Sequence, residues 1–296
     1  MDDLELRKIL TGVVAGFAFA GMLAEPPAAR ADGVEPAPQA IIPLAPYLRA
    51  QATVHAVVNG QAGTFMFDTG EGVTCMSPAL AKKAGGEPWG RISGFRMSGE
   101  RLDNPHCDHV TFDLAGQRLL APVVSTLDIM QFMGEGIPPI DGAIGLDLFA
   151  HRVITIVPRR EIVLESPESF AVRIKNAREV PIRLVRDAEG VALAVDAAVP
   201  TPKGMAWMEL DSGNGGSLVV ANHIAPLLDL PTDAATPRPG RFALANGIEV
   251  QGGIRTRDLI MDGNIGAQFL NHWILTLDLE HERAWLSPLP EGTANP

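Results

Sequence analysis

The stretches DTGEGVTCM (residues 68–76) and DSGNGGSLV (residues 211–219) follow one pattern. Each has an aspartate, a hydroxyl residue and a glycine, a second glycine two positions on, and then a hydroxyl residue before two apolar residues. Each comes directly after an apolar run, TFMF (64–67) or WMEL (207–210), which predicts a strand that ends at the aspartate. The pattern indicates a duplicated unit with one carboxylate per copy. A fold that brings the two carboxylates together would let them share a proton.

A second pair of blocks recurs downstream in the same order. AIG (143–145) and NIG (264–266) are each followed by a histidine six residues after the glycine and a threonine ten residues after it, namely His151 and Thr155, and His272 and Thr276. The apolar runs around both threonines match as well. Two ordered blocks per half predict two homologous halves, the first with a longer segment between its blocks.

Composition favours an all-β fold with a few short helices. The chain has 296 residues, of which 46% are hydrophobic, and it contains 30 glycines and 24 prolines. That balance suits a substantial core built from many short strands and turns. The formal net charge of −11 gives no electrostatic footprint for nucleic acid and does not favour an anionic membrane surface.

The N-terminus predicts an exported protein. Residues 1–31 are typical of a signal peptide, with Arg7 and Lys8 before an uncharged run over 9–24 and a small-x-small cleavage site at 29–31. An uncleaved membrane anchor is the alternative, since acidic residues before the run are atypical of a signal. We therefore expect a periplasmic or secreted protein that is free of the membrane after signal removal. The Pro/Ala-rich residues 32–44 predict a flexible lead.

The local patterns place each aspartate at the end of a hairpin. Strand-like runs over 53–58 and 63–67 are joined around Asn59-Gly60, a strong tight-turn signal. Runs over 191–199 and 205–210 repeat this arrangement in the second half. A short helix is predicted over 77–85, with Ser77 as its N-cap and Gly85 at its end. We expect an N-terminal lobe over 45–168, a connection over 169–180 and a C-terminal lobe over 181–290.

The two Asp-hydroxyl-Gly motifs, each with its downstream glycine block, resemble the aspartic peptidases of the pepsin/retropepsin superfamily. The likeness covers nearly all of the mature sequence and is greatest to bacterial exported retropepsin-like proteins with two lobes in one chain. It implies two homologous β-barrel-like lobes of acid-protease type with a central cleft. It also implies that Asp68 and Asp211 form a catalytic pair across a pseudo-twofold axis.

The resemblance implies a mechanism as well. One carboxylate takes a proton from a water held between the pair, and the other, protonated, donates to the scissile carbonyl. This chemistry needs no metal and no cofactor. Supporting roles are implied for the hydroxyls, which bond across the axis, and for the glycines, which let the backbones approach; these residues are Thr69, Gly70, Ser212 and Gly213. The expected partner is a peptide or protein substrate bound by a monomer.

Several features depart from the pepsin pattern or stay open. Glu71 and Asn214 follow the two motifs where small or hydroxyl residues are usual, so a catalytically inactive peptide- or protein-binding protein on the same scaffold is the alternative function. Glu71 either raises the pKa of the pair or faces solvent. Hairpins over 94–102 and 241–251 are the flap candidates, and residues 130–140 either line substrate pockets or form a surface loop. Cys75 and Cys107 form a disulfide or remain free thiols.

Overall fold

The first hairpin leads directly to the first aspartate. In the computed structural model, which describes residues 36–290, strand β3 (Gln51–Val58) pairs antiparallel with β4 (Gln61–Phe67). Asn59 and Gly60 connect them with φ values of 46° and 84°, the left-handed backbone that a two-residue hairpin turn requires. The predicted hairpin is confirmed, and Asp68 follows at the end of β4.

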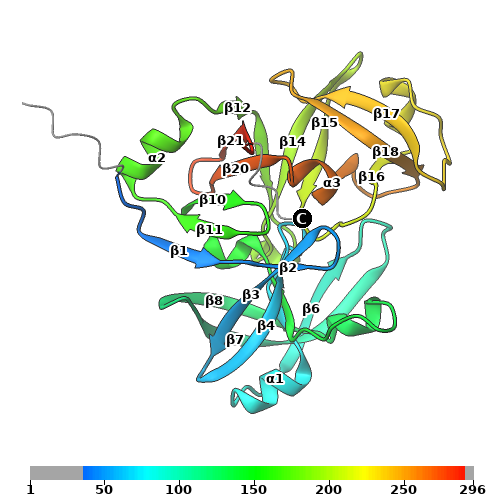
Figure 1. Ribbon diagram of the computed structural model, residues 1–296. Coiled ribbons are helices and arrows are strands. Elements are labelled where there is room, and N and C mark those ends of the chain that lie inside the picture. The colour runs from blue at the N-terminus through cyan, green and yellow to red at the C-terminus, as the bar shows by residue number, and fades with distance from the viewer. Residues whose placement is uncertain (1–35, 291–296) are drawn as a thin grey trace, which may run out of the picture. The chain divides into compact units, whose positions relative to one another are not determined.

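The N-terminal half forms an eight-stranded sheet (Figure 1). In spatial order its strands are β2 (Ala45–Tyr47), β3, β4, β9 (Gly142–Ile144), β5 (Cys75–Met76), β8 (Gln117–Thr126), β7 (Arg101–Leu114) and β6 (Trp89–Phe95). Helix α1 (Pro78–Lys83) begins after Ser77, whose hydroxyl accepts a hydrogen bond from the Leu80 N–H, as predicted. Two 3-10 helices, η1 (Ile129–Phe132) and η2 (Leu146–Phe149), complete this lobe.

The C-terminal half forms a seven-stranded sheet. Its order is β13 (Ile182–Val185), β14 (Ala194–Thr201), β15 (Gly204–Asp211), β19 (Gly263–Gly266), β16 (Leu218–Ala221), β18 (Glu249–Arg257) and β17 (Arg238–Ala243). The short helices here are η3 (Ala188–Gly190), η4 (Ala225–Leu228) and α3 (Ala267–Leu270). In both halves, the strand with the glycine block pairs in parallel with the strand that leads to the aspartate, and the register is the same. Phe67 lies opposite Ile144, and Leu210 lies opposite Ile265. The duplication predicted from sequence is therefore a duplication of structure.

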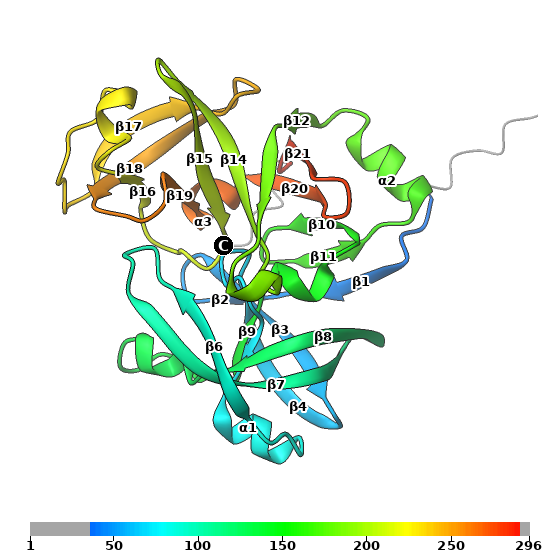
Figure 2. The same cartoon turned by 180° about the vertical axis from the view of Figure 1, so that it is seen from behind.

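A third, six-stranded sheet takes strands from both halves (Figures 1 and 2). Its order is β1 (Ala40–Pro43), β11 (Glu161–Leu164), β10 (Val153–Val157), β20 (Trp273–Asp278), β21 (Arg283–Pro288) and β12 (Arg178–Val180), and helix α2 (Pro167–Ile174) lies between β11 and β12 in the chain. The central strands β10 and β20 are antiparallel, with Thr155 directly opposite Thr276. The two buried hydroxyls lie 2.9 Å apart and hydrogen-bond to each other across the centre of the repeat.

Two expectations are corrected by the structure. Residues 40–43, expected within a flexible lead, form β1, because their backbone pairs with β11 and Ile42 is buried at 1% exposure. Cys75 and Cys107 are both free and buried, so the disulfide alternative is wrong. The predicted signal peptide lies outside the described residues, and the lobe boundaries stay predictions. Within residues 36–290, none of the helices has the length and apolar character needed to cross a membrane.

Aromatic packing fixes the end of the first aspartate strand. Phe65 and Phe67 are both buried, and each meets another buried ring edge-on: Phe65 packs on Phe112 with centroids 5.7 Å apart, and Phe67 on Phe149 at 6.2 Å. Such pairs add roughly 0.5–1.5 kcal/mol beyond the area they bury. These ring contacts hold the C-terminal end of β4 in place, and with it the backbone that leads into Asp68.

The Thr155–Thr276 pair yields a stability prediction. We expect Thr155→Val or Thr276→Val alone to lower the free energy of unfolding by about 1–3 kcal/mol, because each leaves a buried hydroxyl unpaired. The double Val variant removes both hydroxyls and should recover most of that loss. Denaturant unfolding of the four proteins forms a double-mutant cycle. Thr111→Val, at a strand position whose hydroxyl has no hydrogen bond among the described residues, is the control, and additive losses in the cycle would contradict the coupling.

Candidate active site

The two predicted aspartates meet between the lobes. Asp68 and Asp211 end β4 and β15, and both are buried, at 8% and 7% exposure. Each lies against the glycine of the opposite motif: a Cβ atom placed on Gly213 would be 2.0 Å from Asp68 Oδ2, and one placed on Gly70 would be 2.6 Å from Asp211 Cγ. No side chain fits in either gap. The structure therefore brings both aspartates and both glycines together as expected, while their catalytic role stays a prediction.

The hydroxyl residues of the two motifs exchange hydrogen bonds across the axis. The Thr69 N–H donates to Ser212 Oγ at 3.0 Å, and the Ser212 N–H donates to Thr69 Oγ1 at 2.9 Å. Each hydroxyl then donates to the opposite strand, Thr69 Oγ1 to the Leu210 carbonyl at 2.5 Å and Ser212 Oγ to the Phe67 carbonyl at 3.3 Å. These reciprocal bonds tie the two aspartate loops to each other and fix how the carboxyl groups face.

Asp68 is held by donors from both lobes. Its Oδ1 accepts the Gly70 N–H at 2.9 Å and the Gly213 N–H at 3.1 Å. Burial raises the pKa of Asp68 well above its usual range, and the neighbouring charges of Asp211 and Glu71 raise it further; a hydrogen bond with the Asp211 carboxyl acts in the same direction. Since like charges this close disfavour double ionisation, the surroundings favour the protonated form of Asp68.

Asp211 is held by a different set of groups, which sequence reasoning missed. Its Oδ1 accepts the Asn214 N–H at 2.9 Å, and its Oδ2 accepts one hydrogen of the Asn264 amide at 2.7 Å. The other Asn264 hydrogen goes to Glu209 Oε2 at 2.9 Å, and Asn264 Oδ1 accepts from Asn214 Nδ2 at 2.8 Å. Burial raises the pKa of Glu209 well above its usual range, with further raising by the charge of Asp211. Asn264 is thus locked in one orientation that donates to Asp211.

The first lobe has its own buried acidic network, built on Glu71 and Asp147. Burial raises the pKa of Glu71 to about 7, while a hydrogen bond from the Cys75 thiol lowers it and the charges of Asp147 and Asp211 raise it. Asp147 accepts both the N–H and the hydroxyl of Thr74, at 2.8 and 2.6 Å, yet its burial still raises its pKa to about 6. Of the two alternatives for Glu71, the structure supports the one in which it raises the pKa of the pair.

Signals for the missed residues were present in the sequence. Glu209 is a charged residue in the otherwise apolar strand before the second motif, and Asn264 occupies the repeat position that Ala143 fills in the first half. Asp147 follows the first glycine block by two residues. A comparison of the two halves that looked for polar residues at apolar positions would have found Glu209 and Asn264, whereas Asp147 has no such signal.

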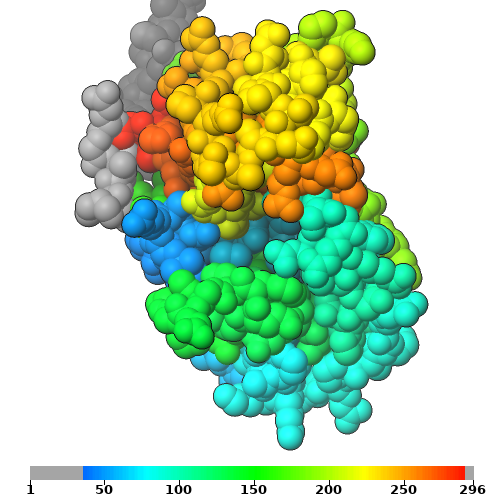
Figure 3. All heavy atoms as spheres, turned by 90° about the vertical axis from the view of Figure 1, so that its right-hand side faces the viewer, coloured from blue at the N-terminus to red at the C-terminus, as the bar shows by residue number. Residues whose placement is uncertain are grey.

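Asp211 lies in the lining of a large cleft of about 930 Å³, together with Gly70, Glu71, Glu209 and Asn214, whereas Asp68 is not among the lining residues. In the space-filling view the surface is hollowed between the second lobe, yellow and orange, and the cyan and green parts of the first (Figure 3). Over the same cleft, an orange segment of the second lobe meets the cyan hairpin. There the Ile260 N–H donates to the Met97 carbonyl at 3.1 Å.

Of the two hairpins predicted as flaps, one lies over the cleft and the other does not. The hairpin of β6 and β7, which contains residues 94–102, lines the cleft and reaches across it, as expected. The hairpin over 241–251 exists in β17 and β18, but those residues do not line the cleft; its turn contacts Arg178 and Ala198 instead. Within the enlarged first-lobe segment, Phe132 and Met133 line the cleft, so this segment contributes to the pocket wall.

Comparisons with known proteins agree with this geometry. Residues 54–148 match the family model described as "Aspartyl protease". Among solved structures, basic 7S globulin from soybean aligns with a TM-score of 0.55 at 10% identity, covering 83% of this chain and 94% of that one. Conglutin gamma, a basic 7S globulin from lupine seeds, aligns with a TM-score of 0.54 at 10% identity, covering 84% and 94%. No curated protein sequence matches the chain. The chain is thus aspartic-peptidase-like over residues 54–148 and shares its overall fold with the two globulins.

The buried carboxyls predict that stability falls as pH rises. Glu71 and Asp147 have folded-state pKa values raised to about 7 and about 6, so their protonated forms stabilise the fold below about pH 4 and this contribution is lost as pH rises toward 7. We expect the free energy of unfolding to drop by about 1–3 kcal/mol between pH 5 and pH 7.5. Denaturant unfolding followed by tryptophan fluorescence measures this.

Glu71→Gln should reduce the slope of stability against pH, since the amide does not ionise. Glu135→Gln is the matched control, because Glu135 is exposed and its replacement should leave the slope unchanged. Equal slopes in wild type and Glu71→Gln would contradict the assignment.

Proposed function

We propose that this protein is an aspartic endopeptidase that hydrolyses peptide bonds with a water activated between Asp68 and Asp211. The observation that carries the proposal is the reciprocal hydrogen bonding of Thr69 and Ser212, which holds two buried carboxyl groups together, with Asp211 in the lining of a large cleft. The family match over residues 54–148 supports it. A pair of turn aspartates that only capped backbone groups would not need to face each other across two lobes.

The different surroundings of the two carboxyls assign their roles. Asp68, whose pKa is raised by burial and by Asp211 and Glu71, carries the shared proton and donates it to the scissile carbonyl oxygen. Asp211, with the Asn214 N–H and the Asn264 amide donating to it, holds the negative charge and accepts a proton from the attacking water. The water adds to the carbonyl carbon, and the resulting diol collapses as the amine nitrogen takes a proton. No bond forms between enzyme and substrate.

The cleft supports a polypeptide as substrate. Its volume of about 930 Å³ exceeds what one amino-acid side chain fills, and it runs under a hairpin that bridges the lobes. Apolar residues of the first lobe line it, including Ile92, Phe95, Ile129 and Phe132. We infer an endopeptidase that takes an extended segment with apolar side chains and acts as a monomer. A periplasmic or secreted location remains part of the proposal, because it depends on residues 1–31.

Replacing either aspartate should abolish cleavage. We expect Asp68→Asn and Asp211→Asn each to lower the rate of peptide-bond hydrolysis at least about a thousandfold, because the amide neither gives nor takes a proton, while the fold is kept. Purified protein lacking residues 1–31 would be assayed on unfolded casein between pH 3 and pH 8, with circular dichroism as the check on folding. Asp113→Asn is the matched control, since Asp113 caps the turn after β7 and lies away from the cleft.

The outcomes separate the proposal from its alternative. Cleavage at the wild-type rate by both aspartate variants would overturn the assigned site. Saturable binding of peptides by the wild type with no product at any pH would contradict the endopeptidase and favour an inactive peptide- or protein-binding scaffold. Glu71 and Asn214 are the residues that motivate this second candidate, since each stands where the superfamily usually has a smaller residue.

Glu71 should also shape the pH profile of cleavage. Its charge raises the pKa of Asp68, which must be protonated to act as the acid, so Glu71→Gln should move the alkaline limb of the profile to lower pH, by roughly 0.5–1 unit. The measurement is kcat/KM against pH for wild type and variant. Glu135→Gln is the control, because Glu135 is exposed and does not line the cleft. An unchanged or upward-shifted alkaline limb in Glu71→Gln would refute this role.

A further inference from the structure

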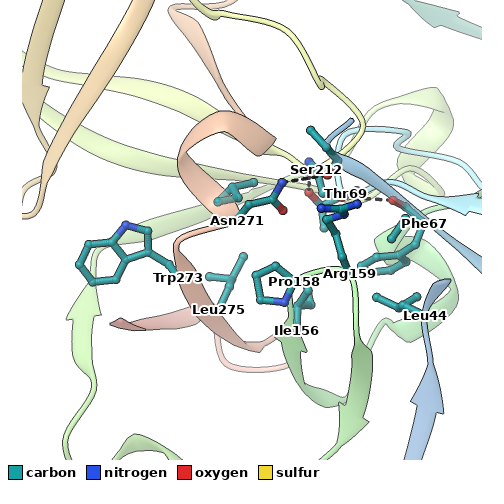
Figure 4. Close-up of a pocket in the computed structure, with 13 residues that line it drawn as sticks. Leu44, Phe67, Thr69, Ile156, Pro158, Arg159, Ser212, Asn271, Trp273 and Leu275 are labelled. Carbon is teal, nitrogen blue, oxygen red and sulfur yellow. Dashed lines mark hydrogen bonds between the residues drawn. The ribbon is translucent and has the colours of Figure 1, made fainter. Parts of the chain in front are cut away.

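A second, smaller cavity lies on the other side of the motifs and shares no lining residue with the cleft (Figure 4). Its volume is about 30 Å³. The side chains around it are mostly apolar and come from both lobes and the six-stranded sheet: Leu44, Ala50, Ala52, Phe67, Ile156, Pro158, Leu270, Trp273 and Leu275, with Thr69, Ser212, Asn271 and Arg159 as the polar members. Arg159 is the only charged residue among them.

Arg159 adopts a backbone conformation that costs free energy. It follows Pro158 in the turn between β10 and β11, which is closed by the Arg160 N–H donating to the Val157 carbonyl at 3.1 Å. Its φ of 57° is left-handed, and a turn with proline second and a left-handed third residue normally has glycine or asparagine there. A side chain at this position costs on the order of 1–2 kcal/mol. Such an outlier points to a use for the side chain.

The Arg159 guanidinium lacks a counter-ion. Figure 4 shows the side chain extending from its turn toward Thr69 and Ser212. Its Nε is fully buried and has no hydrogen-bond partner, and no carboxylate lies within ion-pair distance of the side chain within residues 36–290. By contrast, six other arginines of the described residues form ion pairs with protein carboxylates, among them Arg173, Arg183 and Arg283. A buried donor without a partner is costly, so an anion in the cavity would satisfy it.

The remaining polar groups of the cavity are already engaged. Both hydroxyls donate to backbone carbonyls, and Asn271 Nδ2 donates to the Ala50 carbonyl at 2.9 Å. A volume of about 30 Å³ has room for roughly two waters, which is the size of a carboxylate group. A planar carboxylate also matches the guanidinium fork with two parallel hydrogen bonds. Because the carboxylate fills that volume, a short hydrocarbon tail would lie at the mouth of the cavity, against its apolar lining.

We propose that this cavity binds a small monocarboxylate with a short apolar tail, whose carboxylate pairs with Arg159 and whose tail contacts Ile156, Trp273 and Leu275. The site is independent of peptide cleavage. Because Thr69 and Ser212 form one wall, a bound ligand would rest against the residues that join the two aspartate loops.

The test compares butyrate with its uncharged counterpart butyramide. Saturable binding of butyrate, followed by thermal unfolding and by NMR line broadening of the ligand at constant ionic strength, is expected in the millimolar range, as suits so small a ligand. Butyramide should bind at least tenfold more weakly. Arg159→Gly should weaken butyrate binding at least tenfold and leave the fold intact, because glycine fits a φ of 57° without strain.

Two further variants test whether binding depends on Arg159 and on the cavity. Arg160→Gln is the matched control, since the exposed neighbour lies outside the cavity lining and should bind butyrate like wild type. Ala50→Leu should block binding by filling the cavity while Arg159 is retained. Equal binding of butyrate and butyramide, no saturable binding by wild type, or undiminished binding by Arg159→Gly would each overturn the proposal, whether or not the protein cleaves peptides.

Discussion

The exchange of hydrogen bonds between Thr69 and Ser212 is the constraint on which the site depends. Each lobe alone ends a strand in a tight loop with an aspartate, and neither loop alone fixes its position relative to the other. Each carboxyl already accepts one N–H from its own loop, Gly70 N–H for Asp68 and Asn214 N–H for Asp211. Once each hydroxyl also accepts the other loop's N–H and donates to the other strand's carbonyl, the two loops form one rigid unit. Gly70 and Gly213 are required by that closeness, because a Cβ atom on either would overlap the opposite carboxyl group.

Several carboxyl groups with raised pKa values lie in and around the two aspartate loops. Asp68, Glu71, Asp147 and Glu209 all have pKa values raised chiefly by burial, and none forms an ion pair with an arginine or lysine among the described residues. Such groups are most stable as neutral carboxylic acids, with amides, hydroxyls and backbone N–H groups as partners. The interior therefore favours protonation, which suits chemistry in which one carboxyl must keep a proton.

Local turn and strand patterns predicted the hairpin before Asp68, composition favoured a mainly β fold, and the repeat predicted two homologous halves. That Asp68 and Asp211 meet between two lobes was expected from the resemblance to the aspartic peptidases. What the sequence did not reveal depends on contacts between distant segments. Asn264 acts on Asp211 only because β19 lies beside β15, and Asp147 reaches Thr74 only through the fold of the first lobe. Residues 40–43 appeared to be a linker because their partner strand, β11, is far along the chain.

Duplication also explains how two like carboxyls come to differ. Symmetric lobes would give both aspartates the same surroundings and leave the position of the shared proton undecided. Here the first lobe has Ala143 and Met66 where the second has Asn264 and Glu209, and Glu71 where the second has Asn214. The charge of Glu71 raises the pKa of Asp68, whereas Asp211 accepts hydrogen bonds from the Asn214 N–H and the Asn264 amide and has Glu209 nearby. The hydroxyl residues and glycines that hold the pair together are alike in the two halves, and the asymmetry lies in the residues that surround them.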